Sequence, residues 1–259
     1  MTYRHATERD DYEDLAGGAV LHSAPGFPAF PVRLASEMFQ RALHVRGGGP
    51  CMVWDPCCGS GYLLTVIGFL HRRSISSLLG SDADPEAVRL AERNLGLLGR
   101  DGLEARAADL GARAERWGRP SHAAAARSAR RLARTLADGG GDLPAEARRA
   151  DVFDAGGLRE VLGGRRPGLV VTDVPYGEQT SWLGPDGGSG AAGMLRTLGA
   201  VLPEGAVIAV AVRGRRPPRA DGAHGLVPRG SFKVGTRTVT LLQTAAGGPR
   251  DEDGRRVAP

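Results

Sequence analysis

Cysteine is scarce in this sequence of 259 residues. The only three cysteines, Cys51, Cys57 and Cys58, lie close together in the first half of the chain. An odd number in this arrangement builds no disulfide framework, and it lacks the paired spacing of a zinc site. We therefore interpret them as small buried packing residues, and we expect no bound metal.

A long apolar run is also lacking. The stretch from Met1 to Asp10 carries too many charged residues for a secretory signal, and no later run is long enough to span a bilayer. The sequence therefore predicts a cytoplasmic protein that has no membrane segment.

Lysine is almost absent, because Lys233 is the only one. The net charge of +5 and the pI of 9.6 thus come from arginine. Richness in arginine, alanine and glycine is typical of a GC-rich genome, so codon bias explains part of the basicity. A surplus of guanidinium groups still favours phosphate-bearing partners, and it supports a nucleic acid without indicating a fold.

Apolar runs of strand length alternate with apolar patterns of helical period, which predicts βαβ units and a parallel sheet. Strands at 52–54 and 78–79 are followed by helices at 63–70 and 87–98, respectively. Later strands are expected at 147–150, 169–172, 207–212 and 236–243, the last of them antiparallel. With 41% apolar residues the chain can build a packed core. We predict one domain over residues 1–246 and a disordered tail over 247–259.

A segment of about residues 103–142 is longer than the connection that such units normally need, and we expect a helical insertion there. Its arginines at positions i, i+3, i+4 and i+7 share one helix face; they are Arg127, Arg130, Arg131 and Arg134. This stripe is either an ordinary solvated face or a surface for a phosphate backbone.

The stretch from Asp55 to Gly61 (DPCCGSG) follows a predicted strand and precedes a helix. Gly59 and Gly61 allow a ligand to approach the backbone, and Cys57 belongs to the same turn. The N-terminus of the following helix suits a carboxylate, whereas Asp55 can hold an ammonium group. This turn is typical of a site for the amino-acid end of a nucleoside cofactor.

Two further acidic residues follow predicted strands. Asp82 is at the spacing from Gly61 where a carboxylate reaches a ribose hydroxyl pair. Asp151 can accept from an adenine amino group, and Val152 can contact the ring. A dinucleotide enzyme of the same architecture is the alternative, but Leu64 stands where the third glycine of its fingerprint belongs.

The stretch from Asp173 to Gly177 (DVPYG) follows another hydrophobic strand and should lie at the same sheet edge as Asp55. Asp173 and the Val174 carbonyl could accept hydrogens from a planar amine and fix its attack geometry, with Pro175 shaping the turn. Tyr176 could stack on a base. A plain proline turn after a buried strand is the alternative interpretation.

These motifs resemble those of class I S-adenosylmethionine-dependent methyltransferases and, more closely, the avilamycin-resistance 23S rRNA guanine methyltransferase family. The resemblance runs from about Tyr3 to Leu242. It is carried by residues 20–35 (VLHSAPGFPAFPVRLA), 54–65 (WDPCCGSGYLLT) and 173–178 (DVPYGE). Val174 replaces the commoner proline or leucine of the family motif, and residues 213–230 match poorly.

The resemblance implies a Rossmann-like α/β fold with a central, mostly parallel seven-stranded sheet, helices on both faces and a helical insertion before the third strand. It implies S-adenosylmethionine as cofactor, with Arg33 as a candidate for its carboxylate; a surface arginine on an amphipathic helix is the alternative that we favour for this residue. It also implies methylation of a guanine in 23S rRNA, free or in the large subunit, which gives resistance to orthosomycin antibiotics. The insertion would face RNA, and the enzyme is expected to be a monomer.

Other functions remain open from the sequence. DNA adenine and protein glutamine methyltransferases use a similar acceptor motif, and the basic stripe favours nucleic acid without choosing RNA over DNA. A non-catalytic RNA-binding module could keep the fold without the activity, although intact Asp55, Asp82 and Asp173 argue against it.

Overall fold

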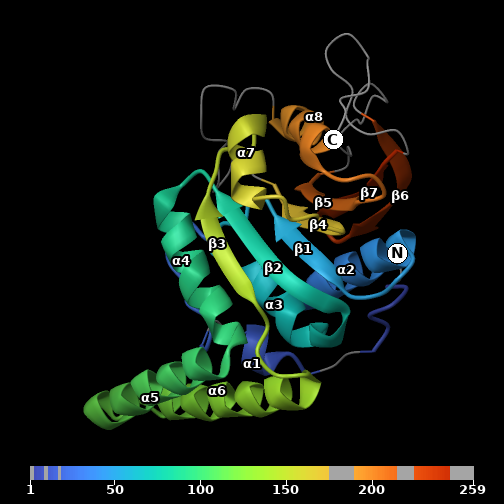
Figure 1. Ribbon diagram of the computed structural model, residues 1–259. Helices are drawn as coiled ribbons and strands as arrows, with labels where there is room; N and C mark the ends of the chain where they lie inside the picture. The colour runs from blue at the N-terminus through green and yellow to red at the C-terminus, as the bar shows by residue number, and fades with distance from the viewer. Residues whose placement is uncertain (1–2, 9–10, 17–18, 175–189, 215–224, 246–259) are drawn as a thin grey trace.

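The computed structural model describes residues 3–8, 11–16, 19–174, 190–214 and 225–245 (Figure 1). The strands are β1 Cys51–Asp55, β2 Ile75–Asp82, β3 Ala145–Arg149, β4 Leu169–Asp173, β5 Val207–Arg213, β6 Leu226–Val234 and β7 Arg237–Thr244. The helices are α1 Glu13–Ala16, α2 Val32–Arg46, α3 Tyr62–Leu70, α4 Pro85–Leu95, α5 Arg100–Trp117, α6 Pro120–Gly139, α7 Ala155–Leu162 and α8 Gly190–Val201, with short 3₁₀ turns η1 Arg72–Ser74 and η2 Gly96–Leu98.

The strands form one seven-stranded sheet in the order β3-β2-β1-β4-β5-β7-β6. The first five strands are parallel, and β7 runs antiparallel to both β5 and β6. The predicted Rossmann-like, mostly parallel sheet is therefore confirmed, together with the antiparallel late strand. Strand order reverses between β1 and β4, which is where this architecture binds ligands.

Strand β6 was not expected from the sequence. Its residues are mostly exposed, and the pairing with β7 shifts register between Pro228 and Gly230. A proline and a bulge break the alternation of apolar and polar residues that indicates a strand. Only Leu226 and Phe232 of this edge strand are buried, so the sequence carried too little signal to detect it.

Helices cover both faces of the sheet, as the resemblance implied. Side chains of α2, α3 and α4 pack on one face, and those of α7 and α8 pack on the other. In β1, Val53 points to the first face while Met52 and Trp54 point to the second. Trp54 is fully buried, and its Nε1 donates to Ser81 Oγ of β2 at 3.0 Å. Burial on both faces explains why the central strands are continuously apolar.

Helices α5 and α6 form an antiparallel hairpin before β3, which is the predicted helical insertion. Figure 1 shows the hairpin below the sheet, with the turn between the two helices extending away from the rest of the chain. Near its other end, α6 contacts α1, α3 and η1. The hairpin thus lies at the edge of the sheet where β1 and β2 begin. None of the helices in the described ranges has the length and apolar character needed to cross a membrane.

Candidate active site

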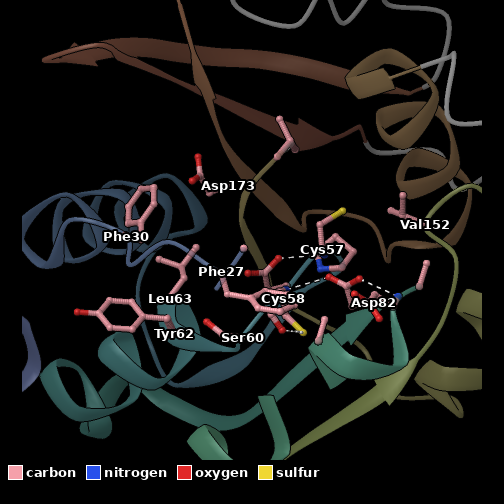
Figure 2. A pocket seen from close by; sticks show the side chains of 18 of the residues that line it. Phe27, Phe30, Cys57, Cys58, Ser60, Tyr62, Leu63, Asp82, Val152 and Asp173 are labelled. Carbon is pink, nitrogen blue, oxygen red and sulfur yellow. Dashed lines mark hydrogen bonds between the residues drawn. The ribbon is translucent and has the colours of Figure 1, made fainter. Parts of the chain in front are cut away.

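A pocket of about 430 Å³ opens at the carboxyl ends of the parallel strands (Figure 2). Five aspartates line it. Four of them lie at or just after the ends of different strands, Asp55 and β1, Asp82 and β2, Asp151 and β3, and Asp173 and β4, and the fifth is Asp84. The parallel order of these strands brings together carboxyl groups that are up to 118 positions apart in the chain. The volume is in the range of small-molecule and cofactor sites.

The turn between β1 and α3 depends on two glycines in the left-handed region. Gly59 has a φ of 52° and Gly61 a φ of 71°. A Cβ at Gly61 would lie 3.0 Å from the Cα of Ala91 in α4, so this position requires glycine for conformation and for close packing. The backbone N–H of Cys58 donates to the Ser81 carbonyl at 2.9 Å and ties the turn to β2.

Asp82 and Asp151 are held by the backbone around the pocket. Oδ2 of Asp82 accepts from the N–H of Gly59 at 2.9 Å, and its Oδ1 accepts from the N–H of Asp84 at 3.0 Å. Oδ1 of Asp151 accepts from the N–H of Phe153 at 2.9 Å. These bonds fix the orientation of both carboxyl groups, as ligand recognition requires.

Asp55 is only 2% exposed, and its Oδ1 accepts from the N–H of Cys57 at 3.1 Å. Burial raises the pKa of Asp55 to about 7, whereas the side chain of Thr172 and the N–H of Cys57 act in the opposite direction. The charges of Asp82 and Asp173 contribute to this rise. Several carboxylates that destabilise one another in one pocket favour a cationic ligand.

Cys57 and Cys58 are neutral thiols in this environment. Burial raises the pKa of both well above the usual value, and the nearby charges of Asp55 and Asp82 raise it further. A thiol with such a pKa is a poor nucleophile at neutral pH. Cys57 lines the pocket, as predicted for a residue of the cofactor turn.

Asp173 and Phe30 lie toward one side of the pocket, while Asp82 and Val152 lie toward the other (Figure 2). Oδ2 of Asp173 is 3.7 Å from Nη2 of Arg237, and the Arg237 guanidinium is 5.0 Å from the centre of the Phe30 ring. Oδ1 of Asp173 is buried and has no hydrogen-bond partner among the described residues. Burial raises the pKa of Asp173 to about 6, against the lowering effect of Arg237 and Arg213.

Arg237, Phe30 and Phe27 were not identified from the sequence. Arg237 begins β7, and antiparallel pairing with β5 places it opposite Arg213, at the edge where Asp173 ends β4. The predicted antiparallel strand at 236–243 was the signal that could have located it. The two phenylalanines come from the segment before α2, whose position over the pocket depends on tertiary packing.

The structure does not bring Arg33 to the pocket. Its Nε and Nη2 donate to the carbonyls of Ala6 and Thr7, each at 2.9 Å, and its guanidinium stacks on Tyr3. Arg33 therefore holds the N-terminal segment against α2, and we leave it out of the proposed cofactor site. Pro175 and Tyr176 lie outside the described residues, as does the predicted tail.

The four arginines of the predicted stripe on α6 are all exposed or partly exposed, but they are not equivalent. Arg131 pairs with Asp14 of α1 through Nη2 and Oδ1 at 2.5 Å, and its Nε donates to Oδ2 at 2.9 Å. This residue connects α1 to the hairpin. Helix α6 contacts η1, which directly precedes β2, so this part of the hairpin lies near the amino end of β2, whereas the pocket lies at the carboxyl ends of the strands.

Comparisons with known proteins agree with this geometry. Residues 1–237 match the model of the family described as rRNA methyltransferase AviRa. A 23S rRNA (guanine(2535)-N(1))-methyltransferase from Streptomyces viridochromogenes is 52% identical over 244 residues, which cover 94% of this chain and 96% of that protein.

Two solved structures of rRNA methyltransferase AviRa from the same organism, at 1.5 Å and 2.4 Å, each superpose with a TM-score of 0.86. They are 50% and 52% identical, and each match covers 95% of this chain and 97% of the other. The overall fold is therefore shared over nearly the whole of both chains. The chain belongs to the AviRa family of rRNA methyltransferases.

Proposed function

We propose that this protein transfers the methyl group of S-adenosylmethionine to N1 of a guanine in 23S rRNA. The observation that carries the proposal is the placement of Asp173 in the same pocket as Asp55, Asp82 and Asp151, with one carboxylate oxygen buried and without a hydrogen-bond partner among the described residues. The substrate follows the name of the relative from Streptomyces viridochromogenes. We place the reaction in the cytoplasm.

The residues on the β1 to β3 side fit S-adenosylmethionine, which supplies a methyl group on a positively charged sulfonium. Asp55 would pair with the ammonium of its amino-acid end, and the N–H groups at the start of α3 would meet the carboxylate. Asp82 would accept from the ribose hydroxyls. Asp151 would accept from the adenine amino group, while Val152 contacts the ring. The repulsion among the aspartates is relieved when a cation binds.

The acceptor side fits a guanine ring nitrogen that carries a hydrogen. The sequence suggested an exocyclic amine, whereas N1 must lose its hydrogen as it gains the methyl group. Oδ1 of Asp173 would accept this hydrogen, and the Val174 carbonyl would accept from the neighbouring 2-amino group on the same base edge. The base must leave its stack to reach Asp173.

Direct transfer in one step suits the groups present. The neutral thiols of Cys57 and Cys58 provide no nucleophile for a covalent intermediate. The nucleotide itself attacks, and Asp173 takes the proton. The modified guanine would then reduce binding of orthosomycin antibiotics to the ribosome.

Replacement of Asp173 by asparagine tests the acceptor assignment. The amide keeps the shape of the carboxylate but cannot take a proton, so single-turnover methylation of a 23S rRNA transcript by Asp173→Asn should fall by about 10²–10⁴-fold. Binding of S-adenosylhomocysteine should stay within about threefold of wild type. Retention of most activity would contradict the role of Asp173. Arg229→Gln, at an exposed arginine of β6, is the matched control.

The choice of substrate needs a separate experiment. Labelled S-adenosylmethionine is incubated with 23S rRNA, large ribosomal subunits, duplex DNA and a protein extract, and the modified rRNA nucleoside is identified by mass spectrometry. We expect label in rRNA as 1-methylguanosine. Label in DNA adenine or protein glutamine would exclude the proposal, and cells that express Asp173→Asn should lose resistance to avilamycin if methylation protects the ribosome.

A further inference from the structure

The turn of the α5–α6 hairpin carries a tryptophan that does not belong to the core. The Trp117 side chain is 52% exposed, and Val227, at 38%, is the other exposed large apolar residue in the described ranges. The ring centre of Trp117 is 5.6 Å from the ring centre of His122, and the Arg116 guanidinium is 5.5 Å from the ring centre of Trp117. Tryptophan is highly buried on average, so an indole that is more than half exposed among charged side chains is unusual.

The charge around Trp117 is strongly positive. Arg113, Arg116 and Arg119 are all exposed within six positions of Trp117, and Glu115 is the carboxylate in that stretch. Across residues 100–139 there are nine arginines and five acidic residues. An exposed aromatic ring among guanidinium groups is the combination with which proteins stack unpaired bases and hold their phosphates.

Several arginines of α4 and α5 lie along the chain between the pocket and this turn. Arg93 on α4 contacts Nδ1 of His22 at 2.7 Å, and Arg106 and Arg113 on α5 lie near the same imidazole. Burial, with a contribution from these three guanidinium groups, lowers the pKa of His22 to about 4. Asp109 neutralises part of the cluster by pairing with Arg106 and Arg113. Arg89, one turn of α4 closer to the pocket, is exposed and pairs with Glu86.

Trp117 lies at the end of the hairpin that is remote from the pocket. Helix α4 begins beside the pocket, and α5, about 27 Å long, then leads to Trp117 at the turn that extends away from the rest of the chain (Figure 1). An RNA that places one base beside Asp173 can reach Trp117 only through a different part of its folded structure. The hairpin therefore suits recognition of a large folded RNA.

We propose that the turn of the α5–α6 hairpin is a second RNA-binding site, at which Trp117 stacks on an unpaired base of 23S rRNA while Arg116 and Arg119 contact phosphates. This inference rests on the proposed function, since it names a remote contact for the same substrate. It assigns the RNA-facing role to the end of the insertion, whereas the α6 stripe expected from the sequence includes Arg131, which is paired with Asp14.

The test compares two RNAs, a long 23S rRNA transcript and a short stem-loop with the target guanine. Trp117→Ala should weaken binding of the long transcript by about five- to a hundredfold, and Trp117→Phe should stay within about threefold of wild type because its ring still stacks. Neither should change binding or single-turnover methylation of the stem-loop at saturation. Val227→Ala is the matched control for loss of an exposed apolar side chain, and thermal melting checks that every variant is folded.

Salt dependence separates stacking from phosphate contacts. Arg116→Gln should reduce the slope of log Kd against log salt concentration by about one, whereas Trp117→Ala should leave the slope unchanged. Unchanged affinity of Trp117→Ala for the long transcript would overturn the proposal, as would an equal loss for both RNAs. A loss seen only with assembled subunits would instead indicate a ribosomal protein as the partner. Failure of the wild type to methylate any 23S rRNA would refute the proposed function itself.

Discussion

Replacement of Arg237 by glutamine removes the guanidinium that pairs with Asp173 at 3.7 Å, and it should move the pH dependence of methyl transfer. Asp173 must be a carboxylate to take the proton from guanine. Its pKa of about 6 already exceeds the usual value because the group is buried, and Arg237 keeps it from rising further. Activity of the wild type should therefore decline as the pH falls through about 6.

The size of the effect follows from the geometry. An opposite charge within about 4–6 Å stabilises a carboxylate by roughly one to three pKa units. Arg213 also acts on Asp173 and remains in the variant, so the lower part of this range applies. At pH 7 the ionised fraction, and with it the single-turnover rate, should fall by about two- to tenfold. By pH 9 the rate should return to the wild-type value.

The assay is single-turnover methylation of a 23S rRNA transcript between pH 5.5 and pH 9, with enzyme and cofactor saturating. Arg237→Lys keeps the charge and should restore most of the wild-type profile, while Arg229→Gln removes an exposed arginine on neighbouring β6 as a control. An Arg237→Gln profile with an unchanged midpoint and a lower plateau would refute the reasoning, because it would show that Arg237 acts on the RNA or on the fold.

Two further predictions follow from other buried carboxyl groups. Asp55 has a pKa of about 7 and must be ionised to pair with an ammonium, so affinity for S-adenosylhomocysteine should fall about tenfold per pH unit below pH 7. Calorimetry should show that Asp55→Asn removes this pH dependence. An affinity of the wild type that does not change with pH would exclude the pairing. Glu37 accepts from the N–H groups of Arg4, His5 and Ala6; burial favours its neutral form, but these bonds and Arg41 lower its pKa to about 2. The contribution of Glu37 to stability is thus complete above its unfolded pKa and is lost as the pH falls from about 4 to about 2. Glu37→Gln should therefore lower the unfolding free energy at pH 7 by about 2–4 kcal/mol, and urea titrations should show that this free energy depends less on acid pH in the variant. Equal losses of unfolding free energy at pH 7 and pH 2 would contradict this prediction.

Much of the fold was present in the local pattern of the chain. Apolar runs of strand length followed by helical periods specify parallel βαβ units, and carboxylates directly after such runs must meet at one edge of the sheet. This is why the sequence alone could assign Asp55, Asp82, Asp151 and Asp173 to one pocket. Strand β6 lacked that pattern, since its bulge and its exposed residues hide the alternation.

Tertiary structure decided which charged groups face which. Arg33 stands in a sequence segment near the cofactor turn, yet its guanidinium binds two backbone carbonyls of the N-terminal segment. Arg237 lies 64 positions after Asp173 and becomes its partner only through the antiparallel pairing of β5 and β7. The sequence by itself determined the types of residue at the strand ends. Their partners, their burial and hence their pKa values depend on contacts between distant segments, which no local pattern encodes.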